Sequence, residues 1–171
     1  MTTAQITPIL TGERADLLQT LAKHRGFLLF TVQNLTEEQA KQRTTVSELT
    51  LGGLIKHVAD VEESWARFIV DGPIAMAGGG EDWANGHRLV EGETLDGQVA
   101  RYQEVARKTD ELVASLPDLD AAHPLPEAPW FEPGAKWSAR RVLLHIIAET
   151  SQHAGHADII REALDGQKSM G

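Results

Sequence analysis

Apolar residues recur at three- and four-residue spacings along much of the chain, which is the period of an amphipathic α-helix. Four segments carry this pattern over several turns, and the last of them is the longest. The predicted long helices cover residues 12–34, 47–71, 94–116 and 138–164. A capping box at residues 36–39 predicts a short additional helix directly after the first one.

The segments between these helices are rich in helix-breaking residues. Gly72-Pro73 ends the second long helix, and a long polar connection follows up to residue 93. Four prolines between residues 124 and 133 predict an extended crossing loop before the last helix. No β-patterned run or internal repeat interrupts this order, so we expect an all-α, four-helix bundle with long crossover connections.

The length and composition suit one compact domain spanning residues 1–171. Cysteine is absent, which excludes a thiolate zinc site and a cysteine nucleophile, so any sulfur chemistry must come from a bound thiol. The start of the chain lacks the pattern of a signal peptide, and no apolar run is long enough to span a bilayer. We therefore expect a soluble, cytoplasmic protein without membrane partners.

The charge balance argues against nucleic acid as a partner. Lys and Arg number 16 and Asp and Glu number 25, which leaves a formal net charge of −9. No basic stripe follows any of the predicted helices, although proteins that track a phosphate backbone need one.

Two of the predicted helices place metal-binding residue types among their apolar positions. On the last helix, Glu149 and His153 lie about 40 degrees apart, within the same stripe as Ile146 and Ile160. On the second long helix, His57 lies in the stripe that faces the core. A carboxylate that faces a core must be protonated, paired with a cation or bound to a metal. Bundle-core metal sites are built from such residues on facing helices.

The residues around these positions resemble the two signature helices of the DinB-like superfamily. The resemblance rests on Leu54-Ile55-Lys56-His57-Val58 followed by Glu62, and on Trp137-Ser138 leading to His145, Glu149, His153-Ala154-Gly155-His156 and Asp158. It covers essentially the whole chain and implies the DinB- and YfiT-like bundle. It is closest to the actinobacterial branch that includes mycothiol-dependent maleylpyruvate isomerase and mycothiol S-transferases.

The resemblance also implies a ligand set and a thiol. Many DinB-like proteins carry three histidines, and the mycothiol-dependent branch has a carboxylate at the position of Glu149. By resemblance, a divalent metal, zinc in the first place with nickel or iron as alternatives, is bound by His57, Glu149 and His153. Three such ligands leave a coordination position open, as in catalytic zinc sites.

The preferred functional hypothesis is a metal-dependent S-transferase that joins mycothiol to small electrophiles in detoxification or a stress response. The isomerases of this branch carry a further C-terminal domain, and only seven residues follow Leu164, so we prefer transfer to isomerisation. One alternative is a non-enzymatic, stress-associated metal-binding bundle that binds a small ligand. Another is a buried hydrogen bond between Glu149 and a histidine, without metal.

Three further residues are candidates for outer partners of the ligands or for substrate contacts, and we expect other polar residues to face solvent. The candidates are His145, His156 and Trp65. The residues expected to be exposed and outside the site are His24, His87, His123, Asp60, Glu62, Glu63 and Arg161. The apolar stripes of the first and third long helices also suggest a homodimer.

Overall fold

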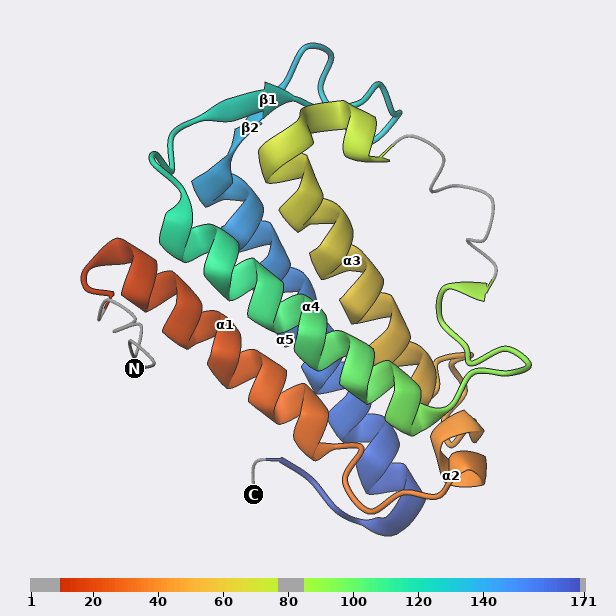
Figure 1. Ribbon diagram of the computed structural model, residues 1–171. Helices are drawn as coiled ribbons and strands as arrows, with labels where there is room; N and C mark the ends of the chain where they lie inside the picture. The colour runs from red at the N-terminus through yellow and green to blue at the C-terminus, as the bar shows by residue number, and fades with distance from the viewer. Residues whose placement is uncertain (1–9, 77–84, 170–171) are drawn as a thin grey trace.

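Four long helices lie side by side and form the body of the molecule (Figure 1). A computed structural model describes residues 10–76 and 85–169, so Trp83 and the glycine run at 78–80 lie outside the described residues. A short 3-10 helix, η1 (Gly72–Met76), extends the second long helix. The α-helices are α1 (Glu13–Phe30), α2 (Glu37–Lys41), α3 (Leu51–Asp71), α4 (Leu95–Ser115) and α5 (Ala139–Asp165). The all-α bundle predicted from the sequence is confirmed.

The helix ends follow from capping side chains. Thr50, Thr94 and Ser138 each accept a hydrogen bond from the backbone N–H three residues later, at the starts of α3, α4 and α5. The predicted capping box is present at Thr36 and Gln39. Because Thr50 caps α3, that helix begins four residues later than the hydrophobic pattern indicated. The left-handed conformation of Gly166 ends α5.

The direction of the helices determines which connection must cross the bundle. Helices α1 and α5 run one way and α3 and α4 run the other way (Figure 1). The connection from α3 to α4 therefore has to return along the length of the bundle. The connections from α1 to α3 and from α4 to α5 each turn at one end.

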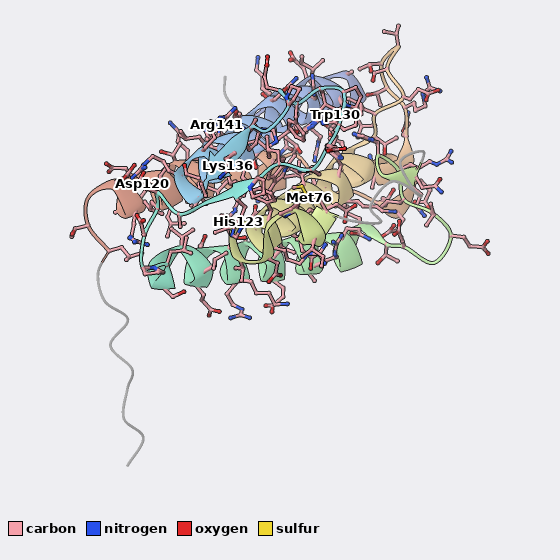
Figure 2. The ribbon with its side chains drawn as sticks, turned by 90° about the horizontal axis from the view of Figure 1, so that it is seen from above. Met76, Asp120, His123, Trp130, Lys136 and Arg141 are labelled. Atoms are coloured by element: carbon pink, nitrogen blue, oxygen red, sulfur yellow. The ribbon has the colours of Figure 1, made fainter. Side chains whose placement is uncertain are left out.

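The connection between α4 and α5 contains a structure that the sequence did not predict. Strands β1 (Ala122–Pro124) and β2 (Lys136–Ser138) form an antiparallel pair at the mouth of the proline-rich loop. The strands are only three residues long, so they carry no period-two pattern that could be recognised. Figure 2 looks onto this end of the molecule, where His123, Trp130 and Lys136 are labelled.

The core consists of two apolar clusters with a buried polar layer between them. One cluster contains Leu28, Val58 and Ile160, and the other contains Leu21 and Ile146 among their neighbours. Along the helices, polar side chains separate the two clusters. The polar residues that are buried in this layer are Arg25, Glu62, Thr109 and Thr150.

Two expectations about charged residues are wrong. Glu62 is fully buried, and both of its carboxylate oxygens accept hydrogen bonds from the Arg25 guanidinium, which lies on α1. Arg161 is also buried: it donates to the carbonyl oxygens of Thr31 and Gln33 and pairs with Asp165. In both cases a distant part of the chain supplies the partner, so helical spacing alone could not reveal the burial.

The predicted homodimer and the predicted lack of a nucleic-acid partner stay predictions. The apolar stripes of α1 and α4 face the interior of the bundle, where Leu21, Leu28, Tyr102 and Val113 are buried. These residues are therefore not available to a partner chain. Across the described residues, none of the helices combines the length and the apolar character that a membrane span requires.

Candidate metal centre

Three side chains from two helices converge on one point beside the core. His57 comes from α3, and Glu149 and His153 come from successive turns of α5. One potential ligand atom from each residue lies within 4.8 Å of the other two. The rings of His57 and His153 meet edge to face, with centroids 4.7 Å apart. The structure thus brings together the three ligands that the sequence analysis proposed.

The carboxylate of Glu149 lies between two histidines of its own helix. Its Oε2 is 3.5 Å from His153 Nε2, and its Oε1 is 3.7 Å from His145 Nε2. These separations are longer than those of charge-assisted hydrogen bonds, which are typically about 2.7–2.9 Å. No Lys or Arg of the described ranges lies at ion-pair distance from Glu149. The geometry therefore does not favour a closed carboxylate–histidine pair.

The histidines are held in their neutral form, which is the form that binds metals. Burial, followed by the nearby His87 and His153, lowers the pKa of His57 to about 3. Burial also lowers the pKa of His153, and the negative charge of Glu149 only partly offsets it. A partly buried carboxylate, 28% exposed, thus faces neutral imidazoles rather than a cation.

This donor set fits a divalent cation. Two imidazole nitrogens and one carboxylate oxygen are the ligands of many catalytic zinc sites, with bonds of about 2.0–2.2 Å. Two ligands at such distances in a tetrahedral site lie about 3.4 Å apart. The distance of 3.5 Å between His153 Nε2 and Glu149 Oε2 is close to this value. The cation would also supply the positive charge that would balance the Glu149 carboxylate.

A cleft of about 560 Å³ opens directly onto these residues. Its walls are mainly apolar and include three large aromatic side chains. The residues that line it are His57, Val61, Trp65, His87, Trp130, Phe131, His145 and Glu149. A ligand in this cleft would therefore contact two of the three candidate metal ligands.

A comparison with known families identifies the family of this chain. The family model described as mycothiol S-transferase matches residues 16–166, which contain the bundle except for the first three residues of α1, and all three candidate ligands. The chain belongs to the mycothiol S-transferase family. No curated protein matches the chain significantly.

In this family member, two outer contacts of the candidate ligands come from α5 itself. His156 Nδ1 lies 3.4 Å from His153 Nδ1, on the ring edge opposite to the nitrogen that faces Glu149. His145 is next to Glu149, and its ring meets those of Trp65 and Trp137 edge to face. Such contacts fix the orientation of metal ligands. The structure therefore places His145, His156 and Trp65 around the predicted site.

His87 is a site residue that the sequence analysis missed. Its ring stacks on that of His57, with centroids 3.9 Å apart and planes inclined by 24°. The expectation that His24, His87 and His123 are solvent-exposed is wrong, because all three are partly buried. His87 comes from the connection before α4, thirty residues from His57, so no regular spacing links the two.

Two glycines at the start of α3 allow His87 to approach. A Cβ atom on Gly53 would lie 1.8 Å from the carbonyl oxygen of His87, and one on Gly52 would lie 2.6 Å from Leu89 Cδ1. The backbone around His87 therefore lies directly on the first turn of α3. The consecutive glycines in the first turn of α3 were the sequence signal of this contact.

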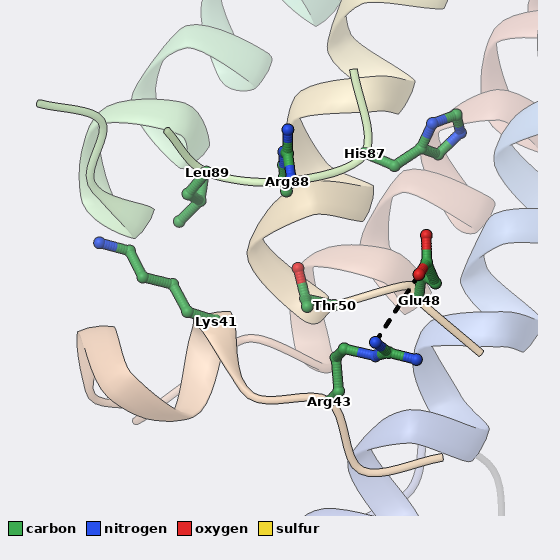
Figure 3. A pocket seen from close by; sticks show the side chains of 7 residues that line it. All are labelled: Lys41, Arg43, Glu48, Thr50, His87, Arg88 and Leu89. Carbon is green, nitrogen blue, oxygen red and sulfur yellow. Dashed lines mark ion pairs between the residues drawn. The ribbon is translucent and has the colours of Figure 1, made fainter. Parts of the chain in front are cut away.

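A second hollow, of about 310 Å³, also has His87 in its lining (Figure 3). It is lined by three basic side chains, Lys41, Arg43 and Arg88, together with Glu48, Thr50, His87 and Leu89. Arg43 pairs with Glu48 at 3.7 Å, and Arg88 donates to Asn85. The imidazole of His87 points away from Lys41 in this view. Since none of the three candidate ligands lines this hollow, we place the site in the aromatic cleft.

Proposed function

We propose that this protein is a metal-dependent S-transferase that joins mycothiol to a small electrophile, in detoxification or a stress response. Membership of the mycothiol S-transferase family supports the thiol and the type of reaction. The observation that carries the metal dependence is the convergence of His57, Glu149 and His153 beside an open cleft, which His57 and Glu149 line.

The three residues would hold a divalent metal, for which we propose zinc, with nickel and iron as alternatives. When bound, such an ion lowers the pKa of a thiol that enters its open position, so the thiol becomes nucleophilic near neutral pH. His145 and His156 would keep Glu149 and His153 in their ligand orientations.

The chain's own residues would position the reactants. Trp65 and Phe131 form an apolar wall that excludes water from the electrophilic carbon. The thiol gives its proton to solvent, and a sulfur electron pair forms the new carbon–sulfur bond. The leaving group departs with the electron pair of the bond that breaks, so the products are a thioether, the leaving-group anion and the proton released to solvent.

The test is thiol transfer with and without metal. Protein purified without an affinity tag is analysed for metal, stripped with a chelator and reloaded with zinc. Mycothiol transfer to a panel of electrophiles is then compared with the uncatalysed rate. We expect activity to be lost on stripping and restored by zinc. A metal-free preparation that reacts at the full rate would contradict the metal-dependent mechanism.

The Glu149→Gln variant sharpens this test. It keeps the size of the side chain and removes its charge, so we expect weaker zinc binding and slower transfer, with partial function because an amide oxygen can still coordinate. Ile159→Ala is a matched control, because Ile159 lies on the same helix, is exposed and does not line the cleft.

The second candidate function is a non-enzymatic metal-binding bundle that binds a small ligand. The half-buried ligand cluster supports metal binding equally well under either hypothesis. Stoichiometric zinc together with no transfer to any electrophile of the panel would favour this alternative.

A further inference from the structure

The cleft beside the candidate metal ligands has an unusual wall for the surface of an acidic protein. Trp65 and Trp137 stack with their ring centroids 4.8 Å apart, and Phe131 meets both of them edge to face. Trp130 continues this array by contacting Phe131. The Trp130 side chain is 75% exposed although it lines the cleft. Leaving an indole in water is unfavourable, and such exposed apolar surface next to a cleft commonly marks a binding site.

The exposed Trp130 is held on a braced loop. Backbone hydrogen bonds join Leu125 N–H to the Ala135 carbonyl, Phe131 N–H to the Ala128 carbonyl and Ala135 N–H to the Glu132 carbonyl. The paired strands β1 and β2 fix the two ends of this loop. Prolines at 126, 129 and 133 restrict its backbone further. A ligand that stacks on Trp130 would therefore meet a surface that needs little ordering.

The charges around the cleft indicate what kind of ligand it takes. No Lys or Arg is among the described residues that line it, and Glu149 is its one carboxylate. The nearest basic side chains lie just outside this lining. Arg141 lies 4.2 Å from the centre of the Trp137 ring, and Lys56 and Arg67 line an adjoining hollow that shares His57 and Trp65 with the cleft. A carboxylate or phosphate group that stacks on Trp130 would therefore lose hydration and meet no basic side chain among the described residues that line the cleft.

From these observations we infer that the electrophile is a flat, uncharged aromatic or conjugated compound that binds against Trp130 and Phe131. This inference rests on the proposed S-transferase function and adds the substrate class to it. Trp130 is then a specificity-determining residue, because it contacts the electrophile but not the metal ligands. With a chloroaromatic substrate, the sulfur–carbon bond forms at the ring carbon, and chloride leaves with the bonding pair as the thiol proton passes to solvent.

Binding of an unreactive aromatic compound tests the substrate class without thiol or turnover. Equilibrium dialysis with dinitrobenzene is performed on the full-length protein and on the variants Trp130→Ala and Trp130→Phe. We expect Trp130→Ala to bind about tenfold more weakly, because stacking is lost, and Trp130→Phe to bind nearly as well as the wild type. Ile159→Ala should bind like the wild type, since this exposed residue lies outside the cleft.

A charged analogue tests the second part of the inference. Dinitrobenzoate has a similar flat ring and adds a carboxylate, so we expect it to bind more weakly than dinitrobenzene. In transfer assays normalised to the uncatalysed rate, chlorodinitrobenzene should be preferred to chlorodinitrobenzoate and to iodoacetamide. Equal binding by Trp130→Ala and the wild type, or equal binding of the two analogues, would overturn the inference.

The two proposals fail in different ways. Thiol transfer to iodoacetamide with no preference for the aromatic electrophile would leave the S-transferase function intact and overturn the substrate class. Binding of dinitrobenzene through Trp130 without transfer to any electrophile would overturn the S-transferase function and leave the class of ligand supported.

Discussion

Glu62 and Glu149 are both carboxylates on the inner sides of long helices, but their surroundings differ completely. Glu62 is fully buried and receives two hydrogen bonds from the Arg25 guanidinium. Glu149 is partly exposed, and the ionisable groups within 4 Å of its carboxylate are the imidazoles of His145 and His153. The first carboxylate has its counter-ion within the chain, whereas the second faces groups that are neutral near pH 7. Burial alone therefore does not mark a functional carboxylate, and the nature of its partners does.

Arg25, the partner of Glu62, is held in its charged form by two carboxylates. Burial opposes the charge of Arg25, but its hydrogen bonds and ion pairs with Glu62 and Asp110 outweigh this and raise the pKa of Arg25 above its ordinary value. The Arg25–Glu62 pair lies between the two apolar clusters, and neither residue lines the cleft of the candidate site. We therefore assign it to the stability of the bundle.

The largest expected effect is the loss of stability in Glu62→Ala. Removing one partner of a buried ion pair leaves an uncompensated charge, which typically costs about 3–5 kcal/mol. Urea unfolding of metal-free protein measures this change. Glu149→Ala is the matched control and should change the free energy of unfolding far less, because no guanidinium is left behind. Equal losses in the two variants would remove the distinction between the two carboxylates.

The second expected effect is the loss of metal from His57→Ala and His153→Ala. Loss of an outer partner of a ligand typically lowers metal affinity about 10–100-fold, so loss of a direct ligand should cost at least as much. Competition with a chromophoric chelator gives the affinities. His24→Ala, on α1 and away from the site, should keep the wild-type affinity. Zinc retained at one ion per chain in both site variants would show that these residues are not the ligands.

The smallest expected effect is a pH dependence of the free energy of unfolding of the metal-free protein, caused by His57. The pKa of His57 is about 3 in the folded chain and about 6.5 when exposed. Between these values the unfolded chain binds a proton that the folded chain does not, so folding stability falls as pH decreases below 6.5. The loss is up to about 1.4 kcal/mol per pH unit.

Comparison with His57→Gln isolates this contribution from other titrating groups. The difference in the free energy of unfolding between wild type and variant should be constant above pH 6.5 and should shift in favour of the variant below it. A difference that does not change with pH would mean that His57 titrates normally in the fold.

Local sequence signals predicted the long helices and the inward positions of the candidate ligands, whereas the pairing of His57 with the ligands on α5 came from the family resemblance. Spacing along a single helix places Glu149 beside His153, and His57 shares a stripe with buried residues of α3, so these positions follow from local periodicity. The capping residues Thr36 and Ser138 likewise act within one turn of their own helix. The helix ends and the face on which each residue lies can be predicted without knowing which segments meet in the fold.

The features that escaped prediction all depend on distant segments. The burial of Glu62 depends on Arg25, which lies 37 residues earlier, and that of Arg161 depends on the turn after α1. His87 reaches His57 only because Gly53 lets a loop lie on the helix. The hairpin strands are too short to show a pattern. In each case the contact joins segments that are far apart in the sequence, so local patterns do not indicate it.

The paired strands β1 and β2 also separate two parts of the molecule that evolution or engineering can change independently. The strands hold residues 125–135 as a loop that begins and ends at nearly the same point, outside the helices that carry His57, Glu149 and His153. Loops of this kind tolerate changes in length and composition that helices do not. Exchanging this loop should therefore redesign the mouth of the cleft while the ligand-bearing frame of the bundle is retained.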